Sequence, residues 1–220
     1  MKDNLRCPAA YDHSISGLFI ALLIALLITL GLAVLFYAEP FIFMQHAFSD
    51  LASTTSKHGL PNSISMTIYA LGMLIGGSIM LRIAAIYARS PNLSHPVIKS
   101  RLAWLASIGF IVSIYPNDLN HTLHSIGVGV VLGALYFFTT IFHFELKDEI
   151  STRAFVFNMT LLQAAVFSYA AAFFLNTAAK QSLQKFCLLG VMITLERVVT
   201  MTEDSYSPLE LRSFLDRFQH

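Results

Sequence analysis

Long apolar stretches and short polar segments alternate along the whole chain. Six stretches are rich in Leu, Ile, Val, Ala and Phe, and they cover about residues 16–37, 63–87, 102–115, 120–144, 154–175 and 182–201. A helix needs about 20 apolar residues to cross a hydrocarbon core of about 30 Å. The pattern therefore predicts an all-α, polytopic membrane helical bundle with six transmembrane helices. It forms a single domain over residues 1–220 that ends in a cytoplasmic tail over 202–220.

The first and the third of these stretches each allow an alternative to a simple spanning helix. The first contains IALLIALLITLGLAVLF, which is too long and too apolar for the core of a signal peptide, so we interpret it as a retained helix. The third, residues 102–115, is the shortest and is ended by Pro116. It is expected either to tilt little or to extend back towards Lys99.

Lysine and arginine are distributed unevenly between alternate connections. One set of connections holds Lys2, Arg6, Arg89, Lys99, Arg101, Lys147, Arg153, Arg212 and Arg217. The other set holds only Lys57 and Lys180, with Lys185 just inside a helix. Because these residues concentrate in cytoplasmic loops, both termini are predicted to lie inside, an N-in/C-in arrangement. The expected location is the cell's inner (plasma) membrane.

Composition supports the bilayer as solvent. Charged residues make up 12% of the chain and hydrophobic residues 55%, against about 25% charged in an ordinary soluble domain. The formal net charge of +1 and the lack of a basic run give no reason to expect nucleic acid as a partner. Expected partners are membrane lipids and, in a larger membrane complex, other proteins. Cys7 and Cys187 are predicted to lie towards opposite sides, so no disulfide is expected.

Small residues recur at helical spacing within the apolar stretches. Gly72, Gly76 and Gly77 lie on the second stretch, and Gly129 and Gly133 lie on the fourth. Small residues four apart let the backbones of membrane helices approach closely. Both groups are therefore predicted to mark helix–helix contacts.

The first outer connection is long and carries polar residues. Within it, residues 41–52 have apolar and aromatic side chains spaced as in a short helix lying in the membrane interface. His46 and Asp50 are four residues apart and would share one face of that helix. We expect this segment to pack over the outer end of the fourth membrane helix. The alternative is a solvated loop helix without a ligand.

A second polar segment precedes the fourth helix. Pro116 ends the third helix, and Asn117 or Asp118 is predicted to cap the fourth by accepting hydrogen bonds from its free N–H groups. Asp118, His121 and His124 then follow at intervals of three residues and span one arc of the helix.

These two segments predict one polar pocket at the outer face. The candidate ligand-binding residues are Asp50, Asp118, His121, His124, Tyr115 and His46. Histidine and aspartate bind metal ions and transfer protons near neutral pH. The D-x2-H-x2-H spacing is not a recognised zinc signature, so the sequence assigns neither a metal site nor catalytic residues. A cap and carbonyl-bonded histidines are the structural alternative.

A third polar set lies towards the cytoplasmic side. Glu196 falls within the sixth apolar stretch, and an unpaired carboxylate in hydrocarbon is unfavourable by a few kcal/mol. Glu196 is therefore expected to face the bundle and to form a buried polar pair with Asn158, with Gln163 as the other candidate partner. A purely structural cluster is the competing interpretation.

No cofactor is expected. A membrane b-type haem needs histidines at one depth on two helices, whereas His124 and His143 lie about 28 Å apart along one helix. Retinal would need a lysine well inside an apolar stretch, and Lys185 lies near an end.

Short motifs resemble a known family. They are Phe48-Ser-Asp-Leu-Ala, Asn62, Tyr115-Pro-Asn-Asp with His121 and His124, and Glu196-Arg197. The chain resembles the six-helix membrane family called domain of unknown function 998, and more loosely the DRAM/Sfk-type lipid-regulating membrane proteins. It departs from the family in having Tyr before Pro116 where Phe is usual, and a His pair where one His is typical. The resemblance implies the six-helix topology and supplies no reaction.

Three classes of function remain open. The first is a membrane protein that binds a lipid headgroup or small ligand in the outer pocket. The second is a structural or accessory subunit of a larger membrane complex. The third is a metal-dependent intramembrane hydrolase, in which the ion would activate a bound water. Whether the chain is an enzyme is left open by its sequence.

Overall fold

The computed structural model describes the backbone of residues 13–216 and the side chains of residues 14–201. Lys2, Arg6, Cys7 and Arg217 lie outside this range. The described elements are α1 (His13–Leu35), the 3-10 helix η1 (Phe48–Ala52), α2 (Ser63–Arg89), α3 (Pro96–Val112), α4 (His121–Glu145), α5 (Thr152–Phe174) and α6 (Lys180–Asp216). The described part of the chain is all-α, as the apolar pattern predicts.

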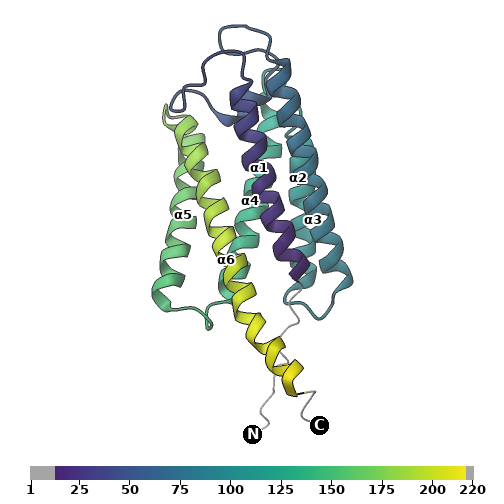
Figure 1. Cartoon of the computed structure of the whole chain (residues 1–220). Helices are drawn as coiled ribbons and strands as arrows, with labels where there is room; N and C mark the ends of the chain where they lie inside the picture. The colour runs from purple at the N-terminus through teal and green to yellow at the C-terminus, as the bar shows by residue number, and fades with distance from the viewer. Residues whose placement is uncertain (1–12, 217–220) are drawn as a thin grey trace.

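The helices form an elongated bundle (Figure 1). The long connection between α1 and α2, residues 36–62, lies at one end, which we call the loop end. The beginning of α1 and the last turns of α6 lie at the opposite end. The chain packs α1 on α2, α2 on α3 and α3 on α4, whereas α5 packs mainly on α6 and touches α4 sparingly. This uneven packing leaves room beside α4.

Glycines create the close contacts within the first four helices. A Cβ built on Gly72 would lie 2.1 Å from the side chain of Thr29 on α1, and one on Gly77 would lie 3.4 Å from the carbonyl oxygen of Ser107 on α3. The predicted contact role of the glycines on α2 is therefore confirmed. On α4 the prediction is wrong, because Cβ atoms built on Gly129 or Gly133 would meet nothing within 4 Å.

Within the described residues, four helices are long and apolar enough to cross a membrane: α1, α2, α4 and α5. Many large apolar side chains on their surfaces are exposed, among them Ile24 on α1, Leu71 on α2 and Phe167 on α5. Lipid tails solvate such side chains, whereas water would not. The described part of the chain has the character of a helical membrane protein.

Two helices and the first connection depart from the ranges of the predicted stretches. α3 begins at Pro96 and so includes Lys99, in keeping with the second expectation for the short third stretch. α6 does not end near residue 201 but continues to Asp216, so most of the predicted tail is helical. In the first connection only five residues form a helix, and it is a 3-10 helix, so the predicted interfacial helix over residues 41–52 is wrong.

Candidate functional site

The connection over residues 36–62 is tied to α6 by hydrogen bonds. The ammonium group of Lys185 donates to the carbonyl oxygen of His46, and the hydroxyl of Ser182 donates to that of Met44 at 3.2 Å. The side-chain oxygen of Gln184 accepts from the backbone N–H of Phe48 at 3.0 Å. The connection therefore covers the loop end of α6.

Lys185 is fully buried. It also donates to the carbonyl oxygen of Gln181 at 3.0 Å, and its nitrogen lies 4.7 Å from the ring centroid of Phe43. Carbonyl oxygens and ring faces satisfy an ammonium group that would otherwise be strongly disfavoured by burial. Lys185 is thus a fixed part of the fold, placed behind the connection.

His46 is part of the hydrogen-bonded contact between this connection and α6, and it does not line an open pocket. Its Nδ1 accepts a hydrogen bond from the backbone N–H of Ile42 at 2.8 Å, and its Nε2 lies 3.5 Å from a carboxylate oxygen of Glu39. Only 4% of the residue is exposed. Burial lowers the pKa of His46, so the neutral ring that accepts from Ile42 is favoured.

Contrary to the prediction, Asp50 and His46 do not share a helical face, because His46 lies outside η1. The carboxylate of Asp50 accepts from the backbone N–H of Ala47 at 2.8 Å and so caps η1. The same oxygen lies 3.4 Å from the ammonium nitrogen of Lys57. Lys57 in turn donates to the carbonyl oxygen of Gln45 at 2.6 Å. Asp50 is therefore half-buried in a network that closes the connection on itself.

Asp118 binds the connection and does not cap α4. Its carboxylate accepts from the backbone N–H of Thr54 at 2.9 Å and from that of Thr55 at 3.2 Å, and also from both threonine hydroxyls. Partial burial opposes its ionisation, but these hydrogen bonds outweigh that effect and lower the pKa of Asp118. The cap of α4 is Asn120, whose side chain accepts from the N–H of Leu123 at 3.0 Å.

The histidines at the start of α4 have separate partners. Nδ1 of His121 pairs with the side-chain oxygen of Asn117 at 2.8 Å, whereas Asp118 binds Thr54 and Thr55. Nδ1 of His124 lies 3.0 Å from the carbonyl oxygen of Tyr115. Tyr115 contributes this carbonyl, while its side chain is exposed.

A cavity of about 500 Å³ opens beside α4 at the loop end. It lies where α5 stands away from α4, and the connection over residues 36–62 contributes Ala47, Ser49, Asp50 and Lys57 to its lining. We call it the loop-end cavity. Its polar or charged lining residues are Ser49, Asp50, Lys57, Asn117, His121, His124, Ser125, Lys180, Gln181 and Gln184. Its other lining residues are Ala47, Val128, Gly129, Leu132, Gly133, Val166, Tyr169, Ala170, Phe173, Phe174 and Cys187.

The lining of this cavity changes from polar to apolar with depth. On α4 the wall begins at His121 and ends at Gly133, which is about 18 Å of helix. The polar residues come first on α4 and α6, and Val128, Leu132 and Val166 lie deeper. The cavity therefore matches an amphiphilic molecule, with a polar group at the loop end and an apolar part within the bundle.

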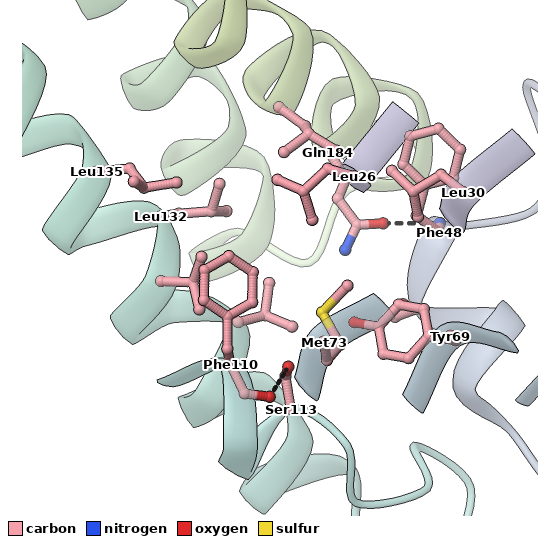
Figure 2. Close-up of a pocket in the computed structure, with 14 residues that line it drawn as sticks. Leu26, Leu30, Phe48, Tyr69, Met73, Phe110, Ser113, Leu132, Leu135 and Gln184 are labelled. Carbon is pink, nitrogen blue, oxygen red and sulfur yellow. Dashed lines mark hydrogen bonds between the residues drawn. The ribbon is translucent and has the colours of Figure 1, made fainter. Parts of the chain in front are cut away.

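A smaller cavity of about 70 Å³ lies next to it in the centre of the bundle. Figure 2 shows its apolar lining, which includes Leu26 of α1, Met73 of α2 and Phe110 of α3. Four residues line both cavities: Ser49, Val128, Leu132 and Gln184. In Figure 2 Gln184 extends towards the central cavity while its oxygen holds the backbone of Phe48. Gln184 is thus part of the wall between the two.

The expected buried pair of Glu196 and Asn158 is wrong. The side chain of Glu196 is exposed, and its carboxylate accepts only from the hydroxyl of Thr200, at 3.4 Å, among the described residues. Asn158 is fully buried, yet neither polar atom of its side chain has a hydrogen-bond partner within the described range. Gln163 accepts from the hydroxyl of Tyr136 at 2.9 Å. Glu196 lies on the exposed face of α6 together with Ile193 and Thr200.

Of the six residues predicted to bind a ligand, Asp50, His121 and His124 line the loop-end cavity, and Asp118, Tyr115 and His46 do not. The polar lining residues Gln181 and Gln184 of α6 were not predicted, because they belong to no cluster of His and Asp residues. Their spacing of three residues at the start of an apolar helix was the available signal. Among the side chains of residues 14–201, no three of His, Cys, Asp and Glu come together to hold a metal ion.

Comparison with known proteins identifies no relative of this chain. No protein-family model, no curated protein and no solved structure matches this chain. The resemblance to domain of unknown function 998 stays a prediction.

Proposed function

We propose that the chain crosses the inner (plasma) membrane six times, with both ends in the cytoplasm and the loop end outside. Arg89, Arg101 and Arg153 are at the end opposite the loop end, whereas Lys57 and Lys180 are at the loop end. This is the bias expected of cytoplasmic and outer connections. α3, with 17 residues or about 26 Å, would cross with little tilt.

We infer that the protein binds an amphiphilic lipid in the loop-end cavity. The observation that carries this proposal is the graded lining, with polar groups from three separate segments at the mouth and apolar side chains below. A headgroup at the mouth would meet Lys57, Lys180 and Gln181, and an acyl chain would lie against Val128 and Val166. Pockets that bind small molecules combine a mostly apolar wall with a few polar groups in this way.

Two features of α4 support the same proposal. Gly129 and Gly133 line the cavity, and the space beyond each of them is open. A glycine within a helix is destabilising by roughly 0.5–1 kcal/mol relative to alanine. No neighbouring backbone approaches closely enough at these positions to explain the loss of helix stability. A ligand lying along α4 would explain it, because the ligand would occupy the space that a side chain would fill.

The test is to fill the cavity. We would purify the wild type and the variants Gly129→Leu and Gly133→Leu, incubate each with vesicles of equal parts phosphatidylglycerol and phosphatidylethanolamine, and exchange into detergent. The lipid retained per protein is then measured by native mass spectrometry. Gly31→Leu is the matched control, since Gly31 is exposed on α1 with open space beyond it and does not line the cavity.

We expect the wild type and Gly31→Leu to retain lipid, and the two cavity variants to lose most of it without loss of thermal stability. Equal retention by all four proteins would overturn the proposal.

A further inference from the structure

His124 carries an unused hydrogen-bond acceptor. The Tyr115 carbonyl oxygen can only accept, so Nδ1 of His124 donates to it and carries the proton of the neutral ring. Nε2 then presents a lone pair. This atom is buried and has no partner within the described part of the chain, and the whole residue is only 1% exposed. A buried acceptor left unpaired is unfavourable, and most such groups in proteins do find a partner.

His124 lies where the lining of the loop-end cavity changes character. It is one turn inside the start of α4, below His121 and above Val128, and it lines the cavity together with both. On its other side the ring of Tyr69 lies 6.1 Å away between centroids. A bound lipid would place the junction between its headgroup and its acyl chain at this level.

We propose that Nε2 of His124 accepts a hydrogen bond from a hydroxyl group at the headgroup–chain junction of the bound lipid. This inference rests on the proposed function and names the ligand class: a hydroxyl-bearing amphiphile. The donor is a neutral hydroxyl because a charged ammonium at this depth would be desolvated against Val128 and the ring of Tyr69. Charged groups of the ligand belong at the mouth, near Lys57 and Lys180.

The mouth indicates the sign of the headgroup. Lys57 is paired with Asp50, whereas Lys180 donates to the side-chain oxygen of Asn176 at 2.7 Å and has no carboxylate within 4 Å among the described residues. An anionic headgroup such as a phosphate would balance Lys180. The ligand class is therefore an anionic lipid with a free hydroxyl close to its acyl chain.

Two probes that differ only in the donor test this inference. The first is oleoyl glycerol phosphate with a free hydroxyl on the middle carbon, and the second is the same molecule with that hydroxyl methylated. Both carry the same charge and chain. Their dissociation constants for the purified full-length protein are measured by native mass spectrometry. We expect the wild type to bind the hydroxyl probe about 5-fold more tightly, the effect of one hydrogen bond.

The variant His124→Phe removes the acceptor and keeps an aromatic ring. We expect it to bind both probes equally, with an affinity for the methylated probe like that of the wild type. His143→Phe is the matched control. His143 is also fully buried on α4, its Nδ1 lies 2.9 Å from the carbonyl oxygen of Thr139, and its Nε2 has no partner in the described range, but it does not line the cavity. His143→Phe should keep the preference for the hydroxyl probe.

The failures of the two proposals are distinguishable. A wild type that binds both probes with equal affinity would overturn the role of His124 and leave lipid binding in place. A wild type that binds neither probe would overturn the proposed function and this inference with it. Because the first comparison uses only the wild type, it holds even if His124→Phe does not fold.

Discussion

The carboxylate of Asp118 accepts a hydrogen bond from the backbone N–H of Thr54 at 2.9 Å and another from the Thr54 hydroxyl at 2.5 Å. These residues are 64 positions apart in the chain. The contact joins the α3–α4 connection to the segment over residues 36–62, which lines the loop-end cavity with Ala47, Ser49, Asp50 and Lys57. Asp118 therefore acts on the candidate site by holding this part of its wall in place.

We predict that Asp118→Asn destabilises the protein by about 1 kcal/mol, because the amide keeps one acceptor oxygen but loses the charge that several donors share. Thermal unfolding in detergent measures the change. Asp148→Asn, at an exposed aspartate of the α4–α5 connection, is the control and should leave stability within about 0.5 kcal/mol of the wild type.

The stability that Asp118 contributes depends on pH. The pKa of Asp118 in the folded protein is lowered, so its contribution is complete above the ordinary aspartate pKa of about 3.9 and is lost as the pH falls through the lowered folded value. The melting temperature of the wild type should therefore fall more steeply with acidification below about pH 5 than that of Asp118→Asn. Parallel curves for the two proteins would contradict this role.

Lys185→Met should loosen the connection over residues 36–62. The substitution removes the hydrogen bonds to the carbonyl oxygens of His46 and Gln181 and leaves these acceptors buried. Trypsin cleavage after Lys57 reports the loosening, since Lys57 lies in this connection. We expect cleavage to become several-fold faster than in the wild type or in the exposed-site control Lys147→Met. An unchanged rate would show that Lys185 does not hold the connection.

Asn158→Leu should stabilise the protein. Both polar atoms of the Asn158 side chain are buried without partners among the described residues, and such groups are unfavourable by about 1–3 kcal/mol. The melting temperature should rise. Gln163→Leu on the same helix is the contrasting variant, because Gln163 accepts from Tyr136 and its loss should lower the melting temperature. A fall with Asn158→Leu would indicate that Asn158 has a partner such as a bound water.

Lys99 and Glu145 should behave as a coupled pair. The Lys99 ammonium is buried, lies 2.6 Å from a Glu145 carboxylate oxygen and sits 4.1 Å from the ring centroid of Phe142. Glu145→Gln leaves this charge without its partner, so we expect a loss on the order of 3 kcal/mol. The double variant with Lys99→Met should recover most of that loss. Additive effects in the double-mutant cycle would rule out the coupling.

The sequence by itself determined the helices and most of their limits. Apolar length is a local property, so α1, α2, α4 and α5 are readable from composition alone. It also grouped six polar or aromatic residues at one end of the bundle, since such residues at the same ends of membrane helices lie at one level. Of these six, Asp50, His121 and His124 line the loop-end cavity, and Asp118, Tyr115 and His46 do not.

Only the tertiary structure decided what each side chain touches. Helical period places Glu196 on a face but does not state which helix that face meets, and in the fold it is exposed. The same spacing of glycines makes a contact at Gly72 and borders a cavity at Gly129. The difference arises because α2 packs tightly on its neighbours, whereas α5 packs on α6 and stands away from α4. Which helices pack together depends on how well surfaces from distant parts of the chain fit one another, and a local sequence pattern does not contain that information.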